Sequence, residues 1–130
     1  MLSISKVNSI SEAELEVMKI LWEASEPVST NSICKKLQEQ SGWDRSTVRT
    51  LIKRLLDKEA VIQEKREVYC YSAIISEAEY LSTQTKSFIG RLYGGSVKNL
   101  VASLVENHEL SKEDIEELKE FLRSGDGPNE

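Results

Sequence analysis

Several features that define common protein classes are missing from this 130-residue sequence. No apolar run approaches the roughly 20 residues that a membrane-spanning helix needs, so we expect no membrane insertion. Residues 1–6 carry no basic stretch followed by an apolar block, so we do not expect a signal peptide. The expected compartment is therefore the cytoplasm.

Cysteine is also scarce, because the chain has only Cys34 and Cys70, which lie far apart in the sequence. A disulfide scaffold normally needs more cysteines, so we expect both thiols to be reduced. We expect Cys34 to be a partly buried helix residue. The sequence predicts neither a bound metal nor another cofactor.

Catalytic motifs are missing as well. The single histidine, His108, stands at a predicted helix end, where a surface or capping role is expected. No glycine-rich dinucleotide motif, P-loop or HExxH motif occurs. The carboxylates are expected on exposed helical faces, where no apolar surroundings would tune their pKa values for acid–base catalysis. The sequence therefore predicts that the protein is not an enzyme.

Charge is present but unevenly distributed. The net charge is −5. Residues 1–76 hold 11 Lys or Arg and 11 Asp or Glu, whereas residues 77–130 hold 6 and 11, so the second part carries the whole excess. Phosphate binding depends on the local field, so an acidic C-terminal part held away from a duplex does not exclude binding of nucleic acid by the first part.

Three helices are predicted in the first part, at 12–24, 30–40 and 45–58. Ser11 and Glu14 have the spacing of a capping box at the start of the first helix. Apolar residues recur at helical spacing in all three.

The third predicted helix has Asp44 as its N-cap and two contrasting faces. Its apolar residues follow the spacing i, i+3, i+4, i+7, i+8 and predict a buried stripe. The stripe consists of Val48, Leu51, Ile52, Leu55 and Leu56. The opposite face holds the densest positive patch of the chain.

The pattern changes to strands after this helix. Two runs rich in branched and aromatic residues, 60–64 and 68–72, flank a basic tip at Lys65 and Arg66 and predict a β-hairpin. Tyr69 and Tyr71 on the second strand are expected to pack against the protein and not to stack on bases. Three helices followed by a hairpin is the order of a winged helix.

The second part is helical again from residue 77. Apolar residues alternate steps of three and four up to Gly94-Gly95, and two further helices follow. A chain this short has a limited core, so burying a helical tail against a second copy would add stability. The expected dimer-interface residues are Leu81, Phe88, Leu92, Val97, Leu100, Val101, Leu104, Leu118 and Leu122.

The expected fold is therefore mainly α with a small β-hairpin wing. We expect residues 1–76 to form a winged helix-turn-helix domain that binds DNA and residues 77–123 to form a C-terminal helical dimerisation domain. Residues 124–130 are expected to be a disordered tail.

The basic face of helix 45–58 suits a DNA-recognition helix. Such a helix packs one stripe on its own domain and offers donors to base edges and phosphates with the other side. Short hydroxyls near its N-terminus can approach phosphates, helped by free N–H groups. A merely solvated face would explain any single basic residue, but not the whole set beside a basic hairpin tip. The candidate DNA-binding residues are Arg45, Ser46, Thr47, Arg49, Thr50, Lys53, Arg54, Lys65 and Arg66.

The order and spacing of several motifs resemble the penicillinase repressor family, which comprises BlaI, MecI and a copper-repressor branch, CopY. The motifs are residues 10–18 with Leu21-Trp22, residues 43–51 with Arg54, Leu55 and Lys58, and the segments 88–95, 100–101 and 110–118. The similarity runs from about residue 8 to 123. It implies a homodimer on a palindromic operator, with each third helix reading one half-site. Family operators resemble inverted TACA/TGTA half-sites.

The resemblance also implies how repression is relieved, and here the branches differ. In the β-lactam branch, a membrane sensor protease system triggers cleavage within the helix after Gly94-Gly95. The aligned bond is Ser103–Leu104, where well-known members carry Asn-Phe. In the copper branch, a C-terminal cysteine cluster binds metal, but no cysteine follows Cys70 here.

We therefore expect a repressor of β-lactam-resistance-type genes. Its alternative within the family is a repressor of copper-homeostasis genes. The alternative class is a helical protein-interaction module that does not bind DNA, and it would have no need for the basic face at 45–54.

Overall fold

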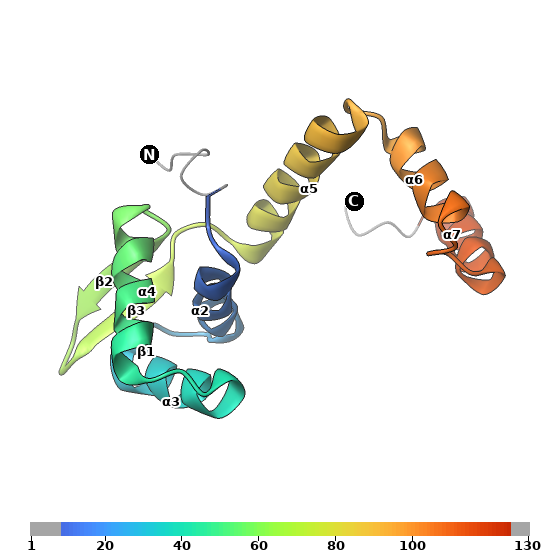
Figure 1. Ribbon diagram of the computed structural model, residues 1–130. Helices are drawn as coiled ribbons and strands as arrows, with labels where there is room; N and C mark the ends of the chain where they lie inside the picture. Colours follow the sequence, from blue (N-terminus) through green and yellow to red (C-terminus); the bar gives the residue numbers. More distant parts are fainter. Residues whose placement is uncertain (1–8, 126–130) are drawn as a thin grey trace. The chain divides into compact units, whose positions relative to one another are not determined.

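The computed structural model describes residues 9–125, which divide between Thr85 and Lys86 into two compact units, an N-terminal unit (9–85) and a C-terminal unit (86–125). The division falls inside α5, and each unit is described by itself. In chain order the elements are α2 (Glu12–Glu23), β1 (Val28–Ser29), α3 (Thr30–Ser41), α4 (Arg45–Asp57), β2 (Val61–Lys65), β3 (Tyr69–Ala73), α5 (Glu77–Tyr93), α6 (Val97–Glu106) and α7 (Lys112–Ser124) (Figure 1).

The N-terminal unit is a winged helix, as the sequence predicts. Helices α2, α3 and α4 pack together, and the antiparallel sheet has the strand order β1-β3-β2. In the hairpin, Val61 pairs with Ala73 and Lys65 pairs with Tyr69, so β2 and β3 form the wing. The short strand β1, in which Val28 pairs with Tyr71, was not predicted, because two residues carry no periodic signal.

The core of this unit lies between the three helices and the sheet. Met18, Ile33, Leu37 and Leu55 are fully buried there. The predicted stripe of α4 is confirmed, although Leu56 at its end is only half-buried. Each fully buried aliphatic side chain contributes about 1.5–3 kcal/mol, so this stripe fixes which face of α4 remains outside.

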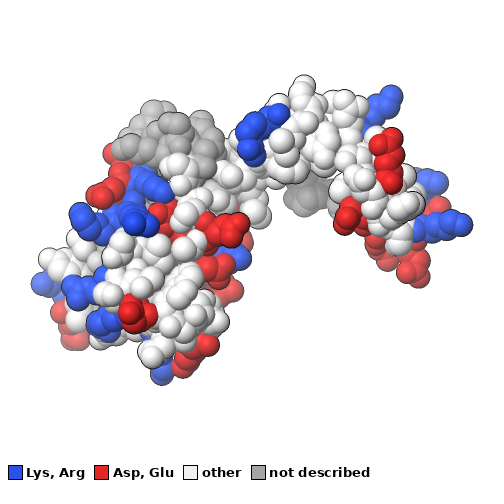
Figure 2. Space-filling model, in the orientation of Figure 1, with Lys and Arg blue, Asp and Glu red and all other residues white. Residues whose placement is uncertain are grey.

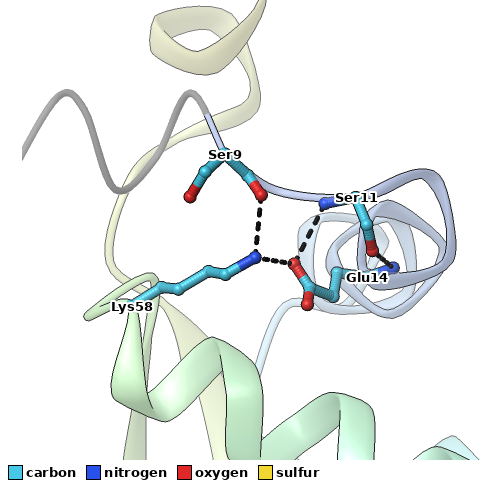
Figure 3. Close-up of polar contacts among 4 residues, drawn as sticks. All are labelled: Ser9, Ser11, Glu14 and Lys58. Atoms are coloured by element: carbon cyan, nitrogen blue, oxygen red, sulfur yellow. Dashed lines mark hydrogen bonds and ion pairs between the residues drawn. The ribbon is translucent and has the colours of Figure 1, made fainter.

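One acidic residue, Glu14, contradicts the expectation that the carboxylates lie on exposed faces. Its side chain is 2% exposed, and its Oε1 lies 2.5 Å from Nζ of Lys58, at the end of α4 (Figure 3). The same oxygen accepts from the backbone N–H of Ser11 at 3.0 Å, and Lys58 also donates to the carbonyl of Ser9 at 2.7 Å. The predicted capping box between Ser11 and Glu14 is thus confirmed. The Glu14 carboxylate also forms an ion pair with Lys58, which links α2 to the end of α4.

The first turns of α5 belong to the N-terminal unit, which therefore extends beyond residue 76. Tyr80 is buried there, with its ring centroid 5.5 Å from that of Trp22. Trp22 Nε1 donates a hydrogen bond of 2.9 Å to the carbonyl of Ile75. These contacts anchor the start of α5 on α2.

The C-terminal unit consists of the rest of α5 with α6 and α7. Gly94 and Gly95 have positive φ angles of 57° and 84°, a conformation that favours glycine, and they end α5 as predicted. In α6 and α7 no residue is buried. Helix α7 ends at Ser124 and is capped by Gly125. The prediction of a disordered tail is therefore wrong for these two residues, and its remainder, 126–130, lies outside the described residues.

Within residues 9–125, no helix is both long enough and apolar enough to cross a membrane.

Candidate nucleic-acid interface

A groove of about 780 Å³ separates α4 from the hairpin in the N-terminal unit. Its lining residues are Thr30, Asn31, Arg45, Arg49, Thr50, Ile52, Lys53, Leu56, Gln63, Lys65, Glu67, Val68, Tyr69 and Tyr71. Four cationic side chains and one carboxylate therefore line it, over a floor that includes apolar side chains. Figure 2 shows Lys and Arg side chains spread over this part of the unit, with acidic ones between them.

The middle of α4 presents Arg49 and Thr50 to the groove, because Val48 and Leu51 are buried on the opposite side. Arg49 is exposed and has no hydrogen-bond or ion-pair partner within residues 9–125. A guanidinium can donate two hydrogen bonds to the N7 and O6 atoms of guanine. The position of Arg49 is therefore suited to reading a base edge.

Two other cations of α4 have partners within the protein. Arg45 donates through Nη2 to Oδ1 of Asn31, so the start of α3 holds this guanidinium beside the groove. Lys53 lies 3.9 Å from the Asp57 carboxylate, and both side chains are well exposed. An exposed ion pair of this kind contributes little, so Lys53 remains available to a phosphate.

On the wing, Lys65 and Tyr69 form one feature of the groove. The Lys65 ammonium lies 4.8 Å from the centroid of the Tyr69 ring, within the range of a cation–π contact. Tyr69 is 47% exposed, so the expectation that it packs into the protein is wrong. The expectation is confirmed for Tyr71, which is buried and accepts a hydrogen bond of 2.9 Å from Gln63.

Arg66, at the hairpin tip, is bound by acidic neighbours. Its Nε lies 2.8 Å from Glu64, and Nη1 lies 3.8 Å from Glu26. The hydrogen bond and the charge of Glu64 raise the pKa of Arg66 above its ordinary value. To contact a phosphate, Arg66 would first have to give up its contacts with Glu64 and Glu26. Lys65 has no acidic partner among the described residues, so it can contact a phosphate without such a loss.

The N-terminus of α4 carries a negative charge. Asp44 caps it by accepting a hydrogen bond of 2.9 Å from the N–H of Thr47 and one of 3.1 Å from the hydroxyl of Ser46. These bonds, led by that of Thr47, lower the pKa of Asp44, so the carboxylate stays ionised. The N–H of Thr47 is therefore not free to help bind a phosphate, contrary to the expectation from sequence.

The structure does not bring all the candidate DNA-binding residues together. Arg45, Arg49, Thr50, Lys53 and Lys65 line the groove. The other four candidates lie outside it and are Ser46, Thr47, Arg54 and Arg66. Arg54 is exposed and acts electrostatically on the buried carboxylate of Glu14, on the α2 side of the helix.

Sequence reasoning missed four polar or charged residues of the groove, which are Thr30, Asn31, Gln63 and Glu67. Asn31 stands in the first turn of α3, where many turn and cap residues are polar, so its type alone gives no signal. Gln63 could have been found, because the alternation of a strand places it on the same face as Lys65.

Residues 9–125 contain no group of three or more His, Cys, Asp or Glu side chains that could hold a metal ion. Cys34 and Cys70 are both free thiols, and Cys34 is a buried residue of α3, as expected.

The sequence of this chain is similar to those of a known protein family. The model of the penicillinase repressor family matches residues 10–124. The penicillinase repressor of Bacillus licheniformis is 38% identical over 120 residues, which cover 92% of this chain and 93% of that protein. The penicillinase repressor of Staphylococcus aureus is 40% identical over 91% of this chain and 94% of its own length. The methicillin resistance regulatory protein MecI of Staphylococcus aureus is 36% identical over 91% of this chain and 96% of its own length.

Two solved structures each match just over half of the chain. The solution structure of the DNA-binding domain of the repressor BlaI matches 57% of this chain and 90% of that domain, with 39% identity and a TM-score of 0.52. The monomeric form of Bacillus licheniformis BlaI, solved in complex with the blaP half-operator, matches 55% of this chain and 88% of its own, with 40% identity and a TM-score of 0.50. The chain therefore belongs to the penicillinase repressor family.

Proposed function

We propose that this protein is a transcriptional repressor that binds a palindromic operator as a homodimer and controls genes of the β-lactam-resistance type. The observation that carries the proposal is the groove between α4 and the wing, in which Arg49 has no partner among the described residues and three further cations stand around it. The names of the relatives support the class of regulated genes.

The contacts to DNA divide by chemistry. Arg49 and Thr50 project from the middle of α4 and are the residues that read base edges in the major groove. Lys53 and Lys65, as compact point charges on flexible stems, neutralise phosphates on either side. Each neutralised phosphate releases counterions, so binding should weaken steeply with salt.

The dimer is formed by the C-terminal unit in this proposal. Large apolar side chains stay exposed in the single chain, and the most exposed are Leu122 at 70%, Leu92 at 59% and Val97 at 59%. A soluble chain gains stability by covering such residues with a second copy. Two recognition helices held in one dimer match the two halves of a palindrome.

Repression is relieved by cleavage of the Ser103–Leu104 bond through a membrane sensor protease system. The bond lies inside α6, and both residues are half-buried. The Ser103 hydroxyl accepts hydrogen bonds from Tyr93 at 3.2 Å and from Asn107 at 3.3 Å. Cleavage would leave Tyr93 and Ser103 on one fragment and place Asn107 and α7 on the other, which would divide the dimerisation surface.

Fluorescence anisotropy tests the central part of this proposal. The full chain is titrated with a duplex carrying inverted TACA/TGTA half-sites and with a scrambled duplex of equal composition, each at 50 and 200 mM salt. We expect binding of the palindrome to be at least about a thousandfold tighter than that of the scrambled duplex, and to weaken with salt. Equal affinity for both duplexes would overturn the proposal.

A further inference from the structure

The hydroxyl of Thr50, a residue that lines the groove, is hydrogen-bonded within α4. Its Oγ1 donates a hydrogen bond of 3.0 Å to the carbonyl of Ser46, one turn earlier in α4. Threonine has a single hydroxyl proton, so this bond occupies the only hydrogen that Thr50 could donate to a base. The oxygen can still accept a hydrogen bond, but the part of the side chain that takes no part in this bond is the methyl group.

The neighbours of Thr50 make this methyl group distinctive. Arg49 and Lys53, on either side along α4, line the groove with charged donors, and the Ser46 hydroxyl is bonded to Asp44. The exposed surface around the middle of α4 therefore offers guanidinium and ammonium donors beside one small apolar group.

In the major groove only thymine presents a methyl group, at C5. A threonine methyl can make an apolar contact with it, whereas cytosine, guanine and adenine offer no such partner. We propose that Thr50 is a specificity-determining residue that contacts the C5-methyl group of a thymine in each half-site. The inference rests on the proposed function, because it assumes that α4 enters the major groove of an operator.

The test compares two variants that separate the two groups of Thr50. Thr50→Val keeps the methyl group and replaces the hydroxyl, and Thr50→Ser keeps the hydroxyl and removes the methyl group. Thr50 is exposed, so neither change disturbs the core, and thermal melting of each variant verifies its fold. The duplexes are the TACA/TGTA palindrome and versions in which one thymine at a time is replaced by deoxyuridine in both half-sites. Deoxyuridine differs only by lacking the methyl group.

At one thymine position we expect deoxyuridine to weaken binding of the wild type and of Thr50→Val by about fourfold per half-site. Thr50→Ser should bind the thymine duplex more weakly by a similar factor and should not distinguish thymine from deoxyuridine at that position. Substitution at the other thymines should weaken all three proteins equally.

Two results would overturn the inference while leaving the proposed function intact. One is specific binding of the palindrome with the same response to deoxyuridine in Thr50→Ser as in the wild type. The other is normal binding by Thr50→Ser with a loss in Thr50→Val, which would assign the readout to the hydroxyl. If the wild type does not prefer the palindrome to the scrambled duplex, the proposed function itself fails and the inference with it.

Discussion

The partners of each side chain determine which charged residues of the proposed interface can contact DNA without first losing a hydrogen bond or an ion pair. Arg49 has no partner among the described residues, whereas Arg66 is bound to Glu64 and Glu26. Both are arginines beside the same proposed interface, yet only the first offers its full set of donors. We therefore rank Arg49 first for base recognition and Lys65, not Arg66, first for phosphate contact by the wing.

The ranking predicts two different binding defects. Arg49→Ala should cost about 1–3 kcal/mol of operator binding and relax the preference for its base, because a bidentate contact to a base edge is lost. Lys65→Ala should weaken binding to all sequences alike and lower the salt slope by about one. Anisotropy titrations against operator and scrambled duplexes at several salt concentrations measure both effects. Equal losses on both duplexes for Arg49→Ala would show that it contacts phosphate instead.

The buried Glu14 predicts a pH dependence of stability. Burial raises the pKa of Glu14, but the hydrogen bond and charge of Lys58 and the N–H of Ser11 leave it below its ordinary value of 4.5 on balance. The unfolded chain therefore binds the proton first as pH falls. The stabilisation is complete above about pH 4.5 and is lost as pH falls through the lower, folded-state pKa.

We therefore expect Glu14→Gln to lower the free energy of unfolding by about 1–2 kcal/mol at pH 7, and the difference from the wild type to shrink below pH 4. Urea denaturation at a series of pH values measures it. The control is Glu16→Gln, whose carboxylate pairs with Lys19 on the surface at 3.3 Å and should matter by less than about 0.5 kcal/mol at any pH. A pH-independent loss in Glu14→Gln would contradict the assignment.

Residue types in the sequence were sufficient to identify the basic face, but they did not reveal the bonds within it. The sequence points to Ser46 and Thr50 for their hydroxyls, but the Ser46 hydroxyl is bonded to the N-cap Asp44 and the Thr50 hydroxyl to a carbonyl inside α4. Glu14 was assigned to an exposed face because its partner, Lys58, is 44 residues away in the sequence. Such distant partners leave no local signal.

At the level of whole elements, helix caps were the most predictable feature. Ser11 and Asp44 each accept the backbone N–H that their positions predict, because capping depends on residues only three apart. Tyr80 was not predicted to be buried, because the heptad pattern of α5 points to a different face. Its burial depends on Trp22 of α2, a contact that periodicity within one helix cannot show.

The Asp44 cap has a consequence for how tightly α4 binds DNA. Asparagine caps helices as well as aspartate does, so Asp44→Asn keeps the cap and removes one negative charge. We expect roughly twofold tighter operator binding in 50 mM salt, with a smaller gain in 200 mM salt. Anisotropy titrations measure this change.

The control for this prediction is Asp44→Ala, which removes the cap as well and should lower stability by about 1 kcal/mol. Weaker operator binding by Asp44→Asn than by the wild type would mean that the carboxylate makes a favourable contact with DNA, for example with the N4 amine of cytosine.

At the scale of the whole molecule, the two units have separate proposed tasks, which are DNA binding for the N-terminal unit and dimerisation for the C-terminal unit. The N-terminal unit has a buried core of its own, whereas α6 and α7 bury no residue in the single chain. The sequence predicts both tasks, because the apolar stripes and the acidic excess of the second part are visible in it. It does not predict that the compact N-terminal unit extends into α5, since that depends on the packing of Tyr80.

The proposed dimer can be tested at one exposed apolar position. Val97→Asp places a charge in the proposed interface but, because Val97 is 59% exposed, it should not unfold the single chain. We expect the dimer dissociation constant to rise about a hundredfold, because the charge would be buried without a partner. Sedimentation velocity distinguishes the 14.7 kDa monomer from a dimer.

The matched control for the dimer is Asn99→Asp, an exposed residue of the same helix, which adds the same charge outside the proposed interface. An unchanged dimer in Val97→Asp, or a monomeric wild type at micromolar concentration, would contradict the assignment of this surface.

The central claim is that the groove between α4 and the wing is the surface that binds the operator. The most direct test is to record amide chemical shifts of the full chain by ¹H–¹⁵N NMR while a TACA/TGTA half-operator duplex is added. We predict that the perturbed amides cluster in α4, the β2–β3 hairpin and the first turn of α3, and that those of the acidic helix α7 do not move. Perturbations centred on α7, or none in α4 while the duplex is bound, would contradict the account.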